Sequence, residues 1–226
     1  MLQWEFLESA PVPGGGTMDL LRRGDEMIIR VDGRELMGTR VHGSEEALAE
    51  LAFEILGSQK NGRNWNILVG GLGVGFTAAS ALRGCGPGGR VVVAELVPAI
   101  VRWNEGPLGD ASGHPLRDPR AALHAGDVFD LLRDPPEPWD AVLLDVDNGP
   151  KSLTQRGNDR LYSPQGLDIS REALRPGGVL AVWSAHDDKS FTQRFRRAGF
   201  RVALHEVRAR GSRGGNRHWI WTGVKE

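Results

Sequence analysis

Three carboxylate side chains stand where short apolar runs of the sequence end. Glu95 closes one run, Asp127 follows a second run after Gly126, and Asp145 closes a third. Ligands of an open parallel sheet bind beyond the carboxyl ends of its strands, so we expect these three carboxylates to converge on one site. A carboxylate in that place can accept hydrogen bonds from both hydroxyl groups of a ribose.

A glycine-rich turn marks the same site. Residues 66–76 read NILVGGLGVGF, in which an apolar run is followed by Gly71, Gly73 and Gly75, and Glu95 comes about 20 residues later. Glycine adopts backbone conformations that other residues avoid, and it lets a ligand approach the main chain closely. The helix that follows offers free N–H groups and a partial positive charge. Such a turn binds phosphates or the polar tail and ribose of a nucleoside, although a plain tight turn has the same sequence.

Strand and helix signals alternate along the chain. Strands are expected at 66–70, 90–95, 121–126, 139–145, 179–183, 200–207 and 218–224, and helices at 44–57, 76–82, 97–108, 128–133, 164–174 and 188–198. This alternation predicts an α/β fold with an open, mostly parallel sheet of seven strands flanked by helices. The last two strands have no helix between them and should form an antiparallel hairpin at one edge.

A small β appendage is expected ahead of the main domain, which gives a division into residues 1–43 and 44–226. Residues 1–17 contain many helix and strand breakers and are expected to form a loop outside the core. The segments 26–31 and 35–41 flank the turn sequence Asp32-Gly33 and predict a hairpin. Ser44 is the expected N-cap of the first helix, with Glu45 and Glu46 in its first turn.

Composition narrows the functional classes. The chain has 226 residues and a net charge of −1, so it carries no bulk attraction for nucleic acid or for an anionic membrane. Its single cysteine, Cys85, excludes an intrachain disulfide and suits the reducing cytoplasm. No apolar run approaches the length of a membrane span, and no His and Asp spacing indicates a metal site. We therefore expect a cytoplasmic protein without a metal.

The segment 146–160 is long, polar and without periodicity. Loops of that length in compact domains are usually functional. Because it leaves the sheet at the expected ligand edge, we expect a lid over a second substrate.

The order of these motifs resembles the Rossmann-like class I S-adenosylmethionine methyltransferase fold and, more narrowly, the spermidine synthase family. The resemblance extends from the N-terminal hairpin to the last strand. It depends on the motifs VGGLGVG at 69–75, VAE at 93–95, GD at 126–127, LD at 144–145, LYS at 161–163 and LRPGG at 174–178.

The resemblance implies roles for individual residues. The glycine loop, with Gly70, Gly71, Gly73 and Gly75, would bound the amino-acid or aminopropyl end of the cofactor. Glu95 with Leu96 would hold the ribose, and Asp127, between Gly126 and Val128, would take the adenine amino group. Asp145 would help activate the attacking amine, because a carboxylate within hydrogen-bond reach can accept its proton. A sulfonium cofactor has a good leaving group, so no metal is required.

Three departures separate this sequence from the family pattern. The glycine loop of the family carries an aspartate that contacts an aminopropyl amine, whereas this chain has Leu72-Gly73-Val74. The family's Tyr-His/Gln-Glu element becomes residues 43–46, GSEE, without the tyrosine. After Asp145, Asp147 is the candidate for the second carboxylate of the family motif, or it only shapes the turn.

Three functions stay open from the sequence. The first is a methyltransferase that uses S-adenosylmethionine on a small nucleophile, expected to be an amine. The second is an aminopropyltransferase of spermidine synthase type that uses decarboxylated S-adenosylmethionine, and the third is a non-catalytic nucleoside-binding protein. By resemblance a homodimer is expected. Asp145 and Asp147 are the expected catalytic residues, and the substrate is expected at Glu45, Glu46, Asn148 and Tyr162.

Overall fold

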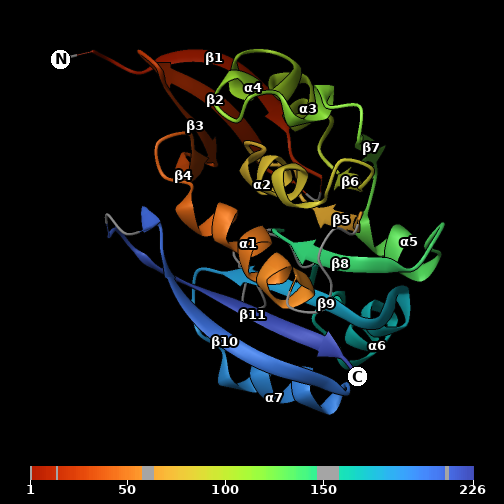
Figure 1. Cartoon of the computed structure of the whole chain (residues 1–226). Helices are drawn as coiled ribbons and strands as arrows, with labels where there is room; N and C mark the ends of the chain where they lie inside the picture. The colour runs from red at the N-terminus through yellow and green to blue at the C-terminus, as the bar shows by residue number, and fades with distance from the viewer. Residues whose placement is uncertain (1, 14, 58–63, 147–157, 212–213) are drawn as a thin grey trace.

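The computed structural model of this chain describes residues 2–13, 15–57, 64–146, 158–211 and 214–226 (Figure 1). Its centre is a seven-stranded sheet of order β10-β11-β9-β8-β5-β6-β7. The strands are β5 (Asn66–Gly70), β6 (Arg90–Glu95), β7 (Ala121–Ala125), β8 (Trp139–Leu144), β9 (Leu174–Ser184), β10 (Phe200–Arg208) and β11 (Arg217–Lys225).

The expected fold class is confirmed by this topology. Strands β5 to β9 run parallel, β11 pairs antiparallel with β9, and β10 pairs antiparallel with β11. Strand β9 is longer than the sequence indicated, because Leu174 already pairs with Trp139 of β8. The parallel strands therefore end along one edge, where the glycine turn and the acidic side chains follow them.

Helices cover both faces of the sheet. They are α1 (Gly43–Gly57), α2 (Phe76–Gly84), α3 (Pro98–Glu105), α4 (Pro107–Asp110), α5 (Val128–Arg133), α6 (Pro164–Ala173) and α7 (Lys189–Arg197), with short 3-10 turns η1 (Pro115–Arg117) and η2 (Asn158–Arg160). Alternate residues of β5 serve the two faces, since Ile67 and Val69 join one apolar cluster and Leu68 joins the other. The central strands β5 and β8 are buried on both sides, as in other parallel sheets.

The single helix expected at 97–108 is interrupted. Gly106 leaves the helical conformation with φ −103° and ψ −140°, and Pro107 then starts α4. Proline lacks the N–H group that would have continued the hydrogen-bonding pattern of α3.

The N-terminal region is more regular than the sequence predicted. It forms a four-stranded antiparallel sheet of β1 (Glu5–Pro11), β2 (Thr17–Arg23), β3 (Glu26–Val31) and β4 (Arg34–Gly38). The expected β3–β4 hairpin is present, and its turn residues Asp32 and Gly33 have φ of 48° and 77°. The expectation that residues 1–17 form a loop outside the core is wrong, because Ala10 and Val12 are buried in the cluster that also includes Leu48 of α1.

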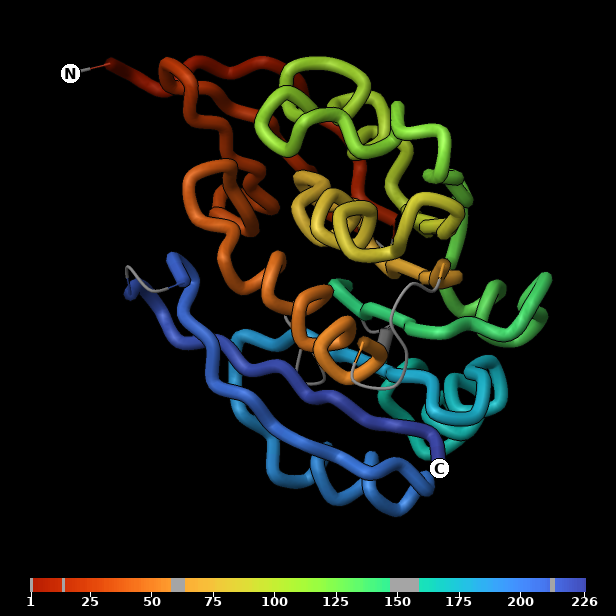
Figure 2. Tube along the Cα trace, viewed as in Figure 1, coloured from red at the N-terminus to blue at the C-terminus, as the bar shows by residue number. Residues whose placement is uncertain are grey.

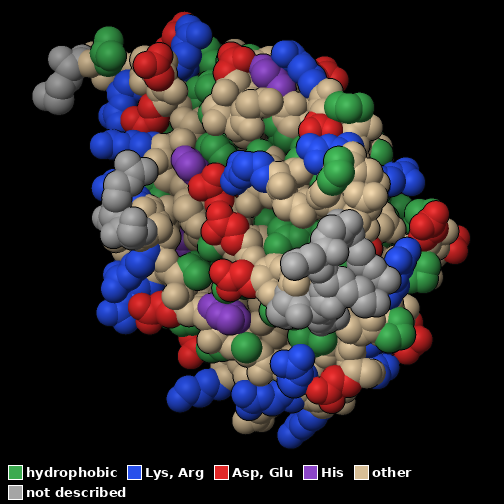
Figure 3. Space-filling model, viewed as in Figure 1, with side chains coloured by type: hydrophobic (Ala, Val, Ile, Leu, Met, Phe, Trp, Pro, Cys, Tyr) green, Lys and Arg blue, Asp and Glu red, His purple; other side chains and the backbone are tan. Residues whose placement is uncertain are grey.

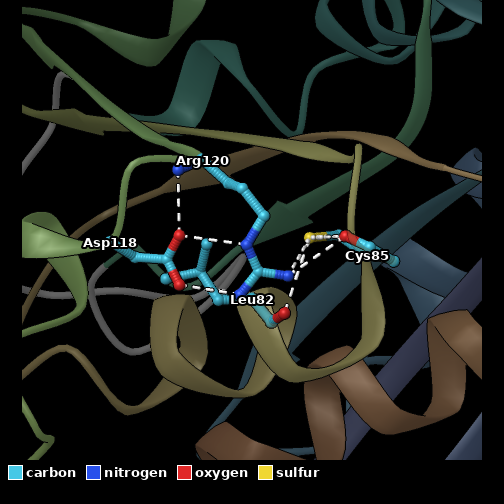
Figure 4. A network of polar contacts seen from close by, with 5 residues as sticks. Leu82, Cys85, Asp118 and Arg120 are labelled. Atoms are coloured by element: carbon cyan, nitrogen blue, oxygen red, sulfur yellow. Dashed lines mark hydrogen bonds and ion pairs between the residues drawn. The ribbon is translucent and has the colours of Figure 1, made fainter.

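A polar network holds the amino-terminal edge of the large sheet (Figure 4). Arg120, which immediately precedes β7, donates from Nη2 to Asp118 Oδ2 at 2.7 Å and from Nη1 to the backbone oxygen of Gly86 at 3.1 Å. The same Nη1 lies 3.6 Å from Sγ of the buried Cys85. Hydrogen bonds from Arg120 hold the pKa of Asp118 down at about 2. This network joins the segment that follows α2 to the start of β7.

The chain ends lie far apart in the view of Figure 2. Within the described ranges, none of the helices combines the length and the apolar character needed to cross a membrane.

Candidate active site

Strand ends bring Asp145 against the glycine turn. The backbone N–H of Asp145 donates to Gly70 O at 2.9 Å, and the N–H of Gly71 donates to Ala94 O at 2.9 Å. Gly71, Gly73 and Gly75 all have positive φ, at 89°, 53° and 99°. A Cβ at Gly71 would lie 2.4 Å from Asp145 O, so only glycine fits there.

The side chain of Asp145 is held by the helix that follows this turn. Thr77, in the first turn of α2, donates its hydroxyl hydrogen to Asp145 Oδ2 at 2.6 Å. Thr77 Oγ1 also lies 3.2 Å from the backbone oxygen of Glu45, which brings the start of α1 to the same place. Burial raises the pKa of Asp145 to about 6, although the Thr77 hydrogen bond opposes the shift.

Glu45 is the second carboxylate of this cluster. Its Oε2 accepts a 2.6 Å hydrogen bond from the hydroxyl of Ser44. Burial and, to a smaller extent, the negative charge of Asp145 together raise the pKa of Glu45 to about 7. Carboxylates whose pKa values are raised toward neutrality are partly protonated at neutral pH, and their ionised fraction can accept another group's proton. We call Asp145 and Glu45 the carboxylate pair.

Ser44 is not the N-cap of the first helix that the sequence predicted. Helix α1 begins at Gly43, so Ser44 lies within its first turn. Its side chain is fully buried and lies between two partners. Besides donating to Glu45, Ser44 Oγ is 2.8 Å from Nδ1 of His218 on β11. The ring of Trp183 packs against His218, with the two ring centroids 4.8 Å apart.

Glu46 faces away from the carboxylate pair. Its carboxylate contacts Nδ1 of His42 at 3.1 Å and the guanidinium of Arg83 at 2.9 Å. It also lines a groove of about 520 Å³ between the start of α1 and the β10–β11 turn, together with Glu50 and Arg210. In the space-filling view, acidic side chains follow one another over α1 (Figure 3).

Glu95, the expected ribose ligand, is buried and binds the glycine turn itself. Its Oε2 accepts from Leu72 N at 2.9 Å, and its Oε1 accepts from Val97 N at 2.8 Å. Burial raises the pKa of Glu95, and the backbone hydrogen bonds oppose that shift. Each carboxylate oxygen has a second lone pair, so the two bonds leave capacity for ribose hydroxyls. The adjoining Leu96 is 41% exposed.

Asp127 caps α5 and pairs with an arginine. Its Oδ1 accepts from Phe129 N at 2.8 Å, and its Oδ2 forms an ion pair with Arg160. Arg160 also lies over the Phe129 ring, 4.7 Å from its centroid. Asp127 therefore reaches an adenine amino group only if it shares that oxygen or gives up Arg160.

The neighbours of Asp127 pack as parts of the scaffold. Val128 is buried, and its Cγ2 lies 3.0 Å from the point where a Cβ of Gly70 would be. A Cβ at Gly126 would meet Nε2 of His124 at 2.8 Å. Space around both glycines is therefore taken by neighbouring side chains, and their contact with a cofactor stays a prediction.

The remaining expected substrate residues fall in two places. Tyr162 is 3% exposed, packs edge-on against Phe191 and donates to Val146 O at 3.4 Å. It lies in the second apolar cluster, so its substrate role stays a prediction. Asp147, Asn148 and most of the expected 146–160 lid lie outside the described residues.

Three residues that shape this site were not predicted from the sequence, namely Thr77, His218 and Asn104. Asn104, 3% exposed on α3, donates from Nδ2 to Gly73 O at 2.8 Å and thereby fixes the glycine turn. Two local signals were available in the sequence. Asn104 is a polar residue on the buried face of a helix, and Thr77 comes directly after the glycine turn. His218 lies 174 residues from Ser44, and no local pattern indicates that contact.

Over the described parts of the chain, no group of three or more His, Cys, Asp and Glu side chains is arranged to hold a metal ion.

Comparison with known sequences finds polyamine aminopropyltransferases. This chain is 30% identical over 165 residues to the polyamine aminopropyltransferase of Mycobacterium tuberculosis, which covers 71% of this chain and 29% of that protein. It is 33% identical over 126 residues to polyamine aminopropyltransferase 1 of Streptomyces coelicolor, over 55% of this chain and 23% of that protein. The aligned segment is thus less than a third of either relative's length. No family model matches the chain.

Comparison with solved structures finds the same architecture at low sequence identity. Spermidine synthase from Thermotoga maritima superposes with a TM-score of 0.76 at 14% identity, over 98% of this chain and 73% of that one. A spermidine synthase in complex with the transition-state analogue AdoDATO gives 0.75 at 14% identity, over 98% and 72%. At this identity the likeness shows the fold alone.

Proposed function

We propose, on the premise that this chain is a spermidine synthase-like protein in sequence and fold, that it transfers an alkyl group from an S-adenosyl sulfonium donor to an amine. The first candidate is aminopropyl transfer, the activity that the names of its sequence relatives state. Its donor would be decarboxylated S-adenosylmethionine. The observation that carries the proposal is the carboxylate pair, which titrates near neutrality beside a glycine turn.

The residues present fit an adenosyl donor. Gly71, Gly73 and Gly75 give an open backbone turn, Glu95 keeps lone pairs for ribose, and Asp127 stands at the neighbouring strand end. When bound, the sulfonium supplies an electrophilic carbon whose leaving group is a neutral thioether. The chain's own task is then to position the amine and to remove its proton.

Asp145 and Glu45 are suited to remove that proton. An amine substrate is an ammonium ion at neutral pH and becomes a nucleophile only after it loses a proton. A carboxylate whose pKa is near the working pH accepts a proton more readily than a carboxylate of ordinary pKa. The negative charge also attracts the ammonium ion into the site.

Methyl transfer from S-adenosylmethionine is a second candidate, because of the surroundings of Gly73. The nearest atom to a Cβ built there is Met37 Sδ at 3.2 Å, and the flanking Leu72 and Val74 are buried. Leu72, Gly73 and Val74 themselves offer no carboxylate side chain to an aminopropyl ammonium, whereas backbone N–H groups suit the carboxylate of the undecarboxylated donor.

The two candidates give different products. We would incubate the protein with each donor and a panel of diamines, and separate the nucleosides by chromatography. Methylthioadenosine formed from the decarboxylated donor supports aminopropyl transfer, and S-adenosylhomocysteine supports methyl transfer. Formation of neither product would contradict both candidates and leave the non-catalytic nucleoside-binding hypothesis.

The cytoplasmic location and the homodimer stay predictions.

A further inference from the structure

Alkylation of an amine leaves the carboxylate pair with a proton that it must discharge. In the transfer the C–S bond breaks with its electron pair staying on sulfur, the amine lone pair forms the N–C bond, and one proton of the ammonium ion is released. Glu45, whose pKa is raised to about 7, is already partly protonated near neutral pH. A base that receives one proton per turnover needs a route to solvent, or it is inactive after the first turnover.

Ser44 and His218 form a hydrogen-bonded chain that begins at Glu45 and leads away from the carboxylate pair. Ser44 Oγ lies 2.6 Å from Glu45 Oε2, and on its other side it lies 2.8 Å from His218 Nδ1. Ser44 is fully buried. A hydroxyl group has one hydrogen and two lone pairs, so it can donate to one neighbour while it accepts from the other, and it can exchange these roles. This is the property required of a group that passes a proton on.

His218 is placed to pass the proton to water. It lies on β11, is half-buried, and packs in a T-shaped arrangement against the ring of Trp183. Burial lowers its pKa, and the neighbouring His186, which is exposed, lowers it further. A neutral imidazole can accept a proton at Nδ1 and release another from Nε2, so it moves a proton without rotating.

We propose that Ser44 and His218 form a proton relay that discharges the carboxylate pair, an inference that rests on the proposed alkyl transfer to an amine. Protonated Glu45 gives its proton to Ser44 Oγ, and the hydroxyl proton of Ser44 passes to His218 Nδ1. The imidazolium ion then loses its Nε2 proton to water or a buffer base. One proton leaves for each proton taken from the amine, and His218 is left with its hydrogen on Nδ1. Exchange of the two neutral tautomers through solvent then resets the relay for the next turnover.

The charged groups around the relay are few. The negative charges of Asp145 and Glu46 both raise the pKa of Glu45. Glu46 is itself paired with Arg83 and His42, so its influence on Glu45 is partly neutralised. Among the described residues, His186 lowers the pKa of His218 by its electrostatic effect.

Removing the relay should slow proton release and leave donor binding intact. We would compare turnover of His218→Gln and Ser44→Ala with a matched control, His205→Gln on the neighbouring β10. The control histidine is also partly buried and contacts a hydroxyl, Thr222 Oγ1, at 3.0 Å. We expect kcat to fall by about 10-fold to 100-fold in both relay variants, with KM for the donor unchanged. High concentrations of free imidazole should restore kcat in His218→Gln and have no effect on the control.

A second measurement does not require turnover. When Glu45 is ionised, Ser44 donates to it and His218 must donate from Nδ1. When Glu45 is protonated, these directions can reverse, which places the hydrogen of His218 on Nε2. Nitrogen NMR of the wild-type protein should therefore show the His218 tautomer changing across the titration of Glu45, and Ser44→Ala should abolish the change.

The outcomes separate this proposal from the proposed function. If the wild type transfers no alkyl group from either donor, the proposed function is contradicted and the relay has no reaction to serve. If the wild type is active and His218→Gln keeps full kcat without imidazole, the relay alone is overturned. A tautomer that stays constant in the wild type while Glu45 titrates would also overturn it.

Discussion

The two edges of the large sheet carry carboxylates with opposite properties. At the amino edge, Asp118 accepts hydrogen bonds from Arg120, and its pKa is lowered to about 2 (Figure 4). At the carboxyl edge, Asp145 and Glu45 are raised to about 6 and about 7 by burial, and Thr77 and Ser44 supply only neutral donors. A carboxylate with a cationic partner stabilises structure, whereas one without such a partner stays available for a proton.

The largest difference should appear when the same substitution is made at each edge. We expect Asp145→Asn to lower kcat by about 10²-fold to 10⁴-fold, because it removes the base. Asp118→Asn should leave kcat unchanged and lower the temperature of unfolding by a few degrees, because it weakens the contacts to Arg120. Product formation and thermal unfolding of the two variants measure both effects. Equal losses of activity would show that the two edges are not functionally distinct.

A glycine substitution tests whether the carboxyl edge needs its close backbone contact. In Gly71→Ala the new Cβ would lie 2.4 Å from Asp145 O at a φ of 89°, so we expect nucleoside binding to be lost. Gly113→Ala is the matched control, since its φ is 76° and no atom lies within 4 Å of its Cβ. The control should cost about 1–2 kcal/mol of stability from backbone strain alone and keep nucleoside binding. Calorimetric titration with methylthioadenosine distinguishes them, and equal affinity in both variants would contradict the role of this contact.

The two edges should also respond oppositely to pH. Folded Asp145 and Glu45 titrate at about 6 and about 7, above their ordinary values of 3.8 and 4.5, so the native state binds more protons between about pH 4 and pH 7. Stability from this pair is therefore lost as pH rises through that range, on the order of 1–3 kcal/mol. Stability from Asp118 is lost instead as pH falls from about 4 to about 2.

Denaturant unfolding of the wild type and of Glu45→Gln across pH 4–8 measures the first effect. Substitution of Glu45 should flatten the decline above pH 4. An unchanged slope in the variant would mean that Glu45 does not titrate in this range.

The smallest expected effect concerns Thr77. Its hydroxyl lowers the pKa of Asp145, so Thr77→Val should raise that pKa by about one unit. The rising limb of the pH–rate profile should then move to higher pH, while Thr77→Ser keeps the hydroxyl and the wild-type limb. A limb in the same place in all three proteins would exclude Thr77 as a ligand of the base.

Local sequence patterns predicted the parts of this fold that depend on neighbouring residues. The glycine turn, strand β6 and helix α5 follow from periodicity and breakers, which act within a few residues. Strand β1 was missed because its residues alternate weakly and become a strand only by pairing with β2.

The candidate site likewise combines features set by neighbouring residues with features set by distant segments. Single acids could be placed at strand ends from the sequence, but their partners come from distant segments. Glu45 meets Asp145 only after α1 packs against α2, and Ser44 meets His218 only when β11 joins the sheet. The partnership of Asp127 with Arg160 likewise depends on the segment before α6. Which carboxylate is neutralised and which is left to titrate is a property of these tertiary contacts.

Single-turnover transfer to a diamine, measured across pH, shows whether the carboxylate pair is the base. With a saturating sulfonium donor, we expect the rate to rise with pH between about 6 and 7 as the carboxylate pair loses its proton. Asp145→Asn should remove that rise. A wild-type rate that is independent of pH from 5 to 8 would show that the pair does not act as the base.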